Sequence, residues 1–182
     1  MHTKRAPIPR RHRGLTLVEL AVVVAVVGIA ASVAVPGLRD LVDSRRLIGT
    51  AARLAADVQF ARSEAVSRNR TLRLGFQSIA GASCYVVHTG AAGQCRCALA
   101  GPAACTGGAA EIKTVVLADA DRVTVDANVA SMVFDPRHGT ITPAATLRTI
   151  DARGRAVHHV VNVMGRVRSC SPGAAVAGFR AC

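Results

Sequence analysis

A run of apolar residues near the amino terminus limits most strongly what this chain can become. Leu15 to Val35 contains 21 residues, and Glu19 is its one charged residue. At about 1.5 Å per residue, a helix of this length spans roughly 30 Å, which is the thickness of the hydrocarbon region of a bilayer. A carboxylate in such a segment costs on the order of a few kcal/mol, so we expect Glu19 to have a function and a partner.

The residues before this run set its orientation. They include no acidic side chain and five basic ones: Lys4, Arg5, Arg10, Arg11 and Arg13. Positive charge next to a membrane segment stays on the cytoplasmic side. The sequence therefore predicts a single-pass membrane protein with residues 1–14 in the cytoplasm and everything after Pro36 outside it.

The junction between the basic residues and the apolar run carries a motif. Residues 14–20, GLTLVEL, resemble the leader-peptidase site of type IV pilins and type II secretion pseudopilins. The resemblance implies cleavage after Gly14 by prepilin peptidase and N-methylation of Leu15, which stands where the family usually has a phenylalanine. It also implies that Glu19 pairs with the free amine of a neighbouring subunit. This pair would set the register of a filament, because an unpaired charge there is penalised.

An ordinary secretory signal peptide is the alternative interpretation of the same segment. The small residues Ser32 and Ala34 fit a cleavage site after Ala34. A signal peptide has no use for Glu19, which favours the pilin interpretation. The first residue of the purified protein separates the two, since Leu15 indicates a pilin and Val35 indicates a secreted protein.

Apolar residues continue after Pro36 at spacings of three and four, which is typical of a helix that packs on one side. They are Leu38, Leu41, Ile48, Ala52, Ala55, Val58, Ala65 and Val66. We therefore predict one helix from Leu15 to about Ser67, with a membrane or filament-core half at 15–35 and an amphipathic half at 36–67. Residues 61–65, ARSEA, are similar to a run that precedes the first strand in the FimT and GspH group of minor pilins.

From Thr71 onward the apolar period changes to two, which indicates β-strands. Strands are expected at residues 71–76, 84–88, 114–117, 122–126, 132–134, 146–150 and 156–163. Residues 90–110 are rich in Gly, Ala and Cys and lack a period, so we expect a long loop there. Residues 68–182 are thus predicted to form one periplasmic β-rich domain. With the helix packed on its mainly antiparallel sheet, this is an α+β fold, and the resemblance identifies it as the type IV pilin fold.

Six cysteines all lie beyond the membrane run, where an oxidising periplasm permits disulfides. Proximity predicts that Cys170 pairs with Cys182 and closes the tail. The others are expected to pair among themselves, in a connectivity that the sequence leaves open: Cys84, Cys95, Cys97 and Cys105. A zinc site built from the last three and His88 is the alternative, but a single residue between two ligands is poor zinc spacing. We therefore predict no metal and no cofactor.

Residues able to carry catalysis are few. Asp119, Asp121 and Asp126 cluster in a turn-rich stretch, where carboxylates are usually solvated strand ends. His158 and His159 are adjacent in an expected strand, so they face opposite sides and do not readily share a metal. The sequence contains no phosphate-binding loop, nucleophile elbow or HExxH motif. These observations indicate a protein that is not an enzyme.

The carboxyl-terminal part of the chain is strongly basic. The whole chain has a net charge of +12, of which +7 remains once the leader is removed. Residues 137–182 contain a single acid, Asp151, and seven arginines: Arg137, Arg148, Arg153, Arg155, Arg166, Arg168 and Arg180. A region with this excess of positive charge favours an anionic partner.

Residues 165–168, GRVR, are the most specific part of this basic region. In a strand Arg166 and Arg168 project from the same face, and two guanidinium groups on one face suit successive phosphates. Gly165 has no side chain and allows a close backbone approach. The segment also matches the GRxR motif of FimT-like minor pilins, some of which bind DNA during natural transformation.

The resemblance implies a minor pilin that joins a type IV pilus and binds double-stranded DNA without sequence preference. The expected DNA-binding residues are Gly165, Arg166 and Arg168, together with Arg153, Arg155 and Arg180. The other implied partners are further pilins or pseudopilins, prepilin peptidase, and the inner membrane before assembly. The alternative is a structural subunit that initiates a type IV pilus or a type II secretion pseudopilus. Its basic tail would then contact acidic pilins instead of DNA.

Overall fold

The computed structural model describes residues 16–182, so the expected leader, including Gly14, and also Leu15 lie outside the described residues. The chain divides into two compact units, and the boundary in the sequence falls between Asp40 and Leu41. One helix, α1 (Leu17–Ser67), begins in the first unit and ends in the second.

The described part of the first unit is the beginning of α1. The Glu19 backbone N–H donates to Thr16 Oγ1 at 3.2 Å, so Thr16 caps the start of the helix. Large apolar side chains of this segment are exposed, and Leu17, Val18 and Ile29 expose 84%, 70% and 69% of their surface. By length and composition the helix is able to cross a membrane. Such a surface is stable against lipid or against other apolar helices.

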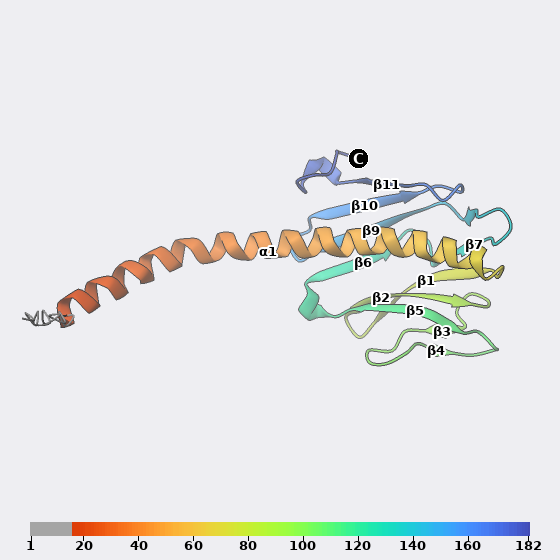
Figure 1. Ribbon diagram of the computed structural model, residues 1–182, viewed down its shortest axis with the longest axis horizontal. Helices are drawn as coiled ribbons and strands as arrows, with labels where there is room; N and C mark the ends of the chain where they lie inside the picture. Colours follow the sequence, from red (N-terminus) through yellow and green to blue (C-terminus); the bar gives the residue numbers. More distant parts are fainter. Residues whose placement is uncertain (1–15) are drawn as a thin grey trace, which may run out of the picture. The chain divides into compact units, whose positions relative to one another are not determined.

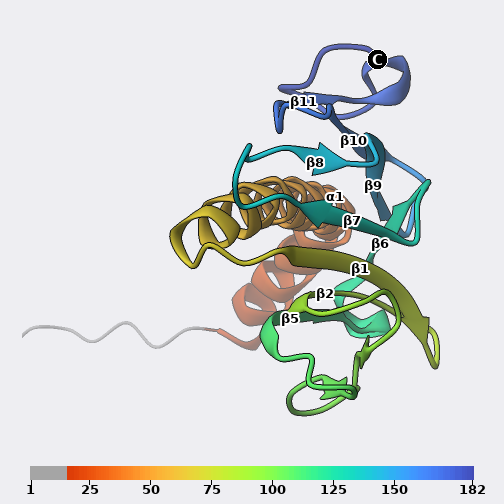
Figure 2. The ribbon, with the colours of Figure 1, turned by 90° about the vertical axis from the view of Figure 1, so that its right-hand side faces the viewer.

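The second unit packs the rest of α1 beside two antiparallel sheets (Figures 1 and 2). The first sheet has the strand order β5-β2-β1-β7-β8, with bounds β1 (Leu72–Ile79), β2 (Ala82–Thr89), β5 (Glu111–Leu117), β7 (Ser131–Phe134) and β8 (Ile141–Thr142). The second has the order β11-β10-β9-β6, with bounds β6 (Val123–Ala127), β9 (Ala145–Asp151), β10 (Ala156–Val161) and β11 (Val167–Cys170). A small hairpin and two short 3₁₀ helices complete the unit: β3 (Cys95–Arg96), β4 (Ala104–Cys105), η1 (Asp119–Asp121) and η2 (Pro172–Ala174).

One face of α1 contributes to the core of this unit. Its fully buried residues are spaced alternately by four and by three: Leu47, Ala51, Leu54, Val58, Ala61 and Ala65. The predicted stripe is correct at Val58 and Ala65 but wrong at four positions that are exposed: Leu38, Leu41, Ala52 and Val66. Alanine occurs on both faces of this helix, so it gave little information about which face is buried.

A buried polar network fixes α1 on the first sheet. Asp57 is 3% exposed and accepts a hydrogen bond from the Tyr85 hydroxyl at 2.8 Å and one from Lys113 Nζ at 2.5 Å. Burial, and then the hydrogen bond to Asp57, raises the pKa of Tyr85 well above its usual range. A carboxylate buried with two donors defines one position of the helix along the sheet, because any shift would leave the charge unpaired.

The α+β pilin fold expected from the sequence is confirmed, including the loop and the tail tied by disulfides. Cys84–Cys97 and Cys95–Cys105 tie the segment between β2 and β5, and Cys170–Cys182 closes the tail. The expected loop at 90–110 was too simple a description, since it contains the β3–β4 hairpin. The strand expected at 156–163 ends at Val161, because a turn begins at Asn162.

Candidate nucleic-acid interface

The GRVR segment lies at the turn between β10 and β11, and β11 is an edge strand of the second sheet. Asn162 organises this turn. Its backbone carbonyl accepts from the Gly165 N–H at 2.9 Å, and its Oδ1 accepts from the Arg166 N–H at 2.8 Å. The Asn162 N–H in turn donates to the Arg166 carbonyl at 3.1 Å. The turn therefore fixes the backbone on both sides of Gly165.

The pairing of β11 with β10 separates polar from apolar side chains. Val167 lies opposite the buried Val161 and packs against the core, whereas Arg168 lies opposite Val160, which is 42% exposed. Arg166, immediately before the strand, is exposed like Arg168. Within residues 16–182, neither guanidinium group has a hydrogen bond or an ion pair with the protein. Both are available to an anion.

Gly165 packs closely against α1. It is buried, its φ is +77°, and a Cβ there would lie 2.9 Å from Cδ and Nε of Arg62. Its carbonyl accepts a hydrogen bond from Gln59 Nε2 at 2.9 Å. The close approach that glycine permits is therefore made by α1 of the same chain, and the predicted role of Gly165 in DNA binding stays a prediction. Gly165 positions the neighbouring arginines.

Arg62 also holds a second basic loop in place. Its Nε donates to the Gly139 carbonyl at 2.6 Å, and Gly139 follows the exposed residues Arg137 and His138. The two loops are joined directly as well, because the Ile141 N–H donates to the Val163 carbonyl at 2.8 Å. Two basic loops are thus seated side by side on the carboxyl-terminal part of α1.

Asp135 shapes the loop that carries Arg137. Its Oδ1 accepts from the backbone N–H groups of Arg137 and His138 at 2.8 Å and 2.7 Å. The hydrogen bond from the His138 N–H is the main reason that the pKa of Asp135 lies below its usual range. Sequence reasoning missed Arg137 as a site residue and counted it only as charge. The only local signal near Arg137 was Gly139, two residues later. The sequence could not show that this loop lies beside Gly165, because the two are linked through Arg62.

Arg153, Arg155 and Arg180 form a separate group. Asp151 accepts from the backbone N–H groups of Arg153 and Arg155 at 3.0 Å and 2.9 Å, and from Arg155 Nε at 2.7 Å. Arg180 is placed nearby, since its carbonyl accepts from the Ser171 N–H while Ser171 Oγ donates to the Ala156 carbonyl.

The six residues of β10 lie between the two groups of arginines. At about 3.3 Å per residue, the two ends of this strand are roughly 17 Å apart. The structure therefore brings Arg166 and Arg168 together with the loop of Arg137, and it does not bring the other three arginines to the same place.

Two histidines of β10 face opposite sides, as the sequence indicated. His159 is 1% exposed, its Nδ1 lies 2.8 Å from Ser169 Oγ of β11, and burial lowers its pKa. His158 lies on the other face, and its pKa is lowered by burial and by the charge of Arg148. Among the described residues no group of three or more His, Cys, Asp or Glu side chains is arranged to hold a metal ion.

An amino-terminal helix of membrane-spanning length that continues into an antiparallel β-domain closed by disulfides defines the pilin class of protein. The family model described as type II transport protein GspH matches residues 50–165, and the chain belongs to this family. The model of the prokaryotic N-terminal methylation motif matches residues 9–35. The resemblance to minor pilins and pseudopilins seen in the sequence is confirmed. The GspH match ends at Gly165, immediately before Arg166.

Comparison with solved structures finds a likeness to the type IV minor pilin FimU of Pseudomonas aeruginosa. The two are 21% identical, with a TM-score of 0.49, and the match covers 69% of this chain and 92% of FimU. Comparison with curated proteins finds no match.

Membership of the family fixes the general role of the chain. It is a type IV minor pilin or pseudopilin, a structural subunit in a family that is not known for enzymatic activity. Membership also implies assembly with other pilins and N-methylation by prepilin peptidase. The apolar first part of α1 fits both membrane anchoring and a place in a filament.

Proposed function

We propose that this chain is a minor pilin of a type IV pilus that binds double-stranded DNA for uptake in natural transformation, through Arg166 and Arg168. One observation carries the proposal. Two exposed guanidinium groups, without a partner among the described residues, flank Val167 on an edge strand whose turn is seated on α1 by Gln59 and Arg62. The turn that carries the two arginines is already ordered, so its backbone loses little further entropy when phosphates bind.

The chemistry favours the DNA backbone as the target. Arginine binds phosphate through two parallel N–H groups, and such contacts position a duplex without reading its sequence. Arg137, on the adjoining loop, adds a third cation to this surface. Arg153, Arg155 and Arg180 are secondary in the proposal, because they lie at the other end of β10 and Asp151 already engages Arg155.

The test is the affinity of the full chain, in detergent micelles, for a duplex of random sequence across a range of salt concentrations. Changing both Arg166 and Arg168 to Gln is expected to weaken binding about tenfold or more at low salt. It is also expected to reduce the slope of log affinity against log salt by about 2, because each lost phosphate contact removes about one unit.

The matched control is the double change of Arg45 and Arg46 to Gln. Both residues are exposed on α1, and replacing them removes the same total charge. Arg46 lies about 24 Å along the helix from Arg62. The control is expected to bind nearly as the wild type. Equal losses in the two variants would show that only net charge matters, and this would contradict a site at Arg166 and Arg168.

The proposal includes processing and assembly of the subunit. Residues 1–14 would face the cytoplasm and be cleaved after Gly14, Leu15 would be N-methylated, and Glu19 would pair with the new amine of a neighbouring subunit in the filament. The periplasmic domain would follow the inner-membrane segment. Mass spectrometry of the mature amino terminus tests this part, since a protein that begins at Val35 would contradict it.

The second candidate function is a structural subunit that initiates a pilus or pseudopilus, with the basic surface contacting acidic pilins. The carboxylates of a partner protein would suit Arg166 and Arg168 as well as phosphates do. Under this alternative, the double Gln variant loses pili or secretion while the wild-type chain shows no salt-dependent binding to DNA.

A further inference from the structure

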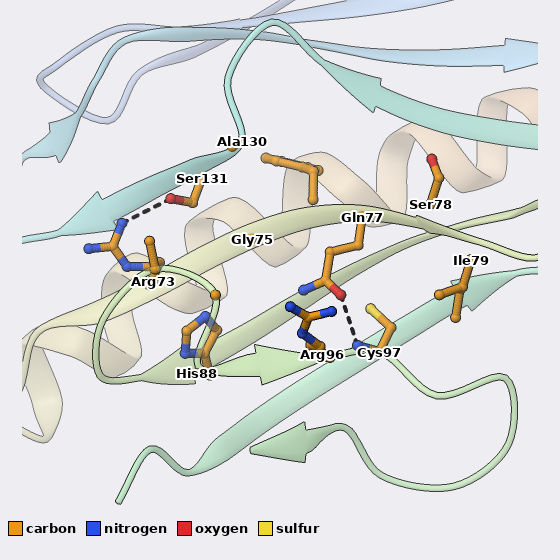
Figure 3. Close-up of a pocket in the computed structure, with 13 residues that line it drawn as sticks. Arg73, Gly75, Gln77, Ser78, Ile79, His88, Arg96, Cys97, Ala130 and Ser131 are labelled. Carbon is orange, nitrogen blue, oxygen red and sulfur yellow. Dashed lines mark hydrogen bonds between the residues drawn. The ribbon is translucent and has the colours of Figure 1, made fainter. Parts of the chain in front are cut away.

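A cavity of about 460 Å³ lies on the face of the first sheet opposite its core face (Figure 3). Leu72 and Leu74 of β1 point into the core, so the alternate residues Arg73 and Gly75 lie on the other face. The segment that carries β3 covers the cavity. Gln77 holds this segment, because its Nε2 donates to the Cys95 carbonyl at 2.7 Å and its Oε1 accepts from the Cys97 N–H at 3.0 Å. The volume is typical of sites for small ligands.

Gly75 opens the cavity, and its presence inside a strand needs a reason. A glycine inside a strand often marks a bulge, a tight bend, or a place where another backbone or a ligand approaches closely. The register of β1 with β2 and with β7 is regular at Gly75, so there is no bulge. A Cβ there would meet only two atoms within 4 Å, His88 Nε2 and Val86 Cγ1, each at 3.8 Å, so no backbone approaches it. The space beside Gly75 is therefore open to a ligand.

His88 presents an acceptor to this space. The side chain is 1% exposed, and its Nδ1 lies 2.8 Å from the Thr89 carbonyl, which only accepts. Nδ1 therefore carries the proton, and in the neutral ring Nε2 is an acceptor that faces the cavity beside Gly75. Within the part of the chain that the structure describes, Nε2 has no hydrogen-bond partner. A ligand that donates a hydrogen bond would satisfy it.

The charged side chains that line the cavity are positive. Arg73 and Arg96 line it, and no Asp or Glu is among its described lining residues. Arg73 is held in place by a hydrogen bond from Nη1 to Ser131 Oγ at 2.9 Å. Figure 3 shows Arg73, His88 and Arg96 around the space next to Gly75. A ligand that fits Arg73, Arg96 and His88 carries an anionic group for the arginines and, close to it, a hydrogen-bond donor for His88.

We propose that the cavity binds the carboxyl end of a peptide-like ligand, with its carboxylate at Arg73 and Arg96 and the adjacent amide N–H donating to His88 Nε2. An N–H next to a carboxylate is the pattern of an acylated amino acid. Ile79 and Ala130 supply apolar surface for a short side chain. The same chemistry occurs in a free N-acyl amino acid and in the carboxyl terminus of a polypeptide.

The test follows backbone amide signals of the full chain in detergent micelles by NMR during titration with N-acetyl-L-valine. Saturable shifts are expected at Gly75, His88 and Arg96. N-acetyl-L-valinamide lacks the carboxylate and pentanoate lacks the N–H, so each is expected to bind about tenfold more weakly or worse. The peptide Ala-Ala-Ala-Val distinguishes the sources, since tighter binding than N-acetyl-L-valine indicates a polypeptide and equal binding indicates a small acid.

Two variants and one control locate the binding. Gly75→Val fills the cavity and suits a strand, and Arg96→Gln removes an exposed cation without touching the core; each is expected to weaken binding about tenfold. Arg45→Gln makes the same charge change elsewhere and is expected to have no effect. Absence of saturable shifts, equal binding of N-acetyl-L-valinamide, or full binding by both variants would overturn the proposal.

Discussion

At the scale of single residues, the contact between Gly165 and Arg62 joins the basic turn to the helix. Arg62 lies against two glycines of positive φ, Gly139 at +60° and Gly165 at +77°, and donates to one of the two loops. A side chain at Gly165 would be strained by its backbone conformation and would displace Arg62. In the proposed function, the glycine of the GRVR segment positions the turn and its two arginines contact DNA.

Gly165→Ala is expected to destabilise the protein by about 2 kcal/mol or more, because it combines backbone strain with a clash. Gly154→Ala is the matched control. Its φ of +79° is nearly the same, but nothing lies within 4 Å of its Cβ position, so it should cost only about 1 kcal/mol. Chemical denaturation of both variants measures the difference, and equal losses would contradict a specific contact with Arg62. Only Gly165→Ala is expected to weaken DNA binding as well.

At the scale of secondary structure, periodicity predicted the elements but not the contacts between them. The change of apolar period at Thr71 located the end of α1 and the first strand within a few residues. It did not show that Arg62 reaches a loop 77 residues away, because such a contact leaves no local pattern. It also missed β8 and β11, whose two and four residues are too few to show a clear alternation. The GRVR turn was found by its motif, whereas Arg137 required the fold.

The β10–β11 pair also contains a group that responds to pH. His159 is buried and burial lowers its pKa, so the folded state binds a proton less readily than the unfolded chain, where histidine titrates near 6.5. The contribution of neutral His159 to the free energy of unfolding is therefore fully present above about pH 6.5. It is lost as the pH falls below this value, by at most about 1.4 kcal/mol per pH unit.

Replacement of His159 by Gln should flatten this dependence, as measured by the free energy of unfolding between pH 7.5 and pH 5. His158→Gln, on the exposed face of the same strand, should retain most of it. If replacing His159 leaves the slope at its wild-type value, carboxylates elsewhere cause the acid sensitivity and His159 does not.

At the scale of the whole molecule, the proposed function assigns assembly and DNA binding to different parts of the chain. The apolar first part of α1 carries Glu19 and belongs to one unit, whereas the basic surface with Arg166 and Arg168 belongs to the other. The proposed function needs both, because a DNA-binding domain outside a filament would not deliver DNA. Changes in the two units should therefore fail at different steps.

Glu19→Gln removes the carboxylate that is proposed to pair with a neighbouring amine. It should leave membrane insertion intact, since a neutral side chain costs less in the bilayer, while incorporation into filaments is lost. In vitro affinity for DNA should stay at the wild-type value. The Arg166→Gln, Arg168→Gln variant should show the reverse, with normal incorporation and weak binding, and both variants should lose transformation.

Immunoblots of sheared filaments and binding assays of the same variants measure the two steps. If Glu19→Gln also weakened DNA binding by the purified chain, or if the double arginine variant failed to assemble, the two activities would be coupled and the basic surface would be better explained as a contact between pilins.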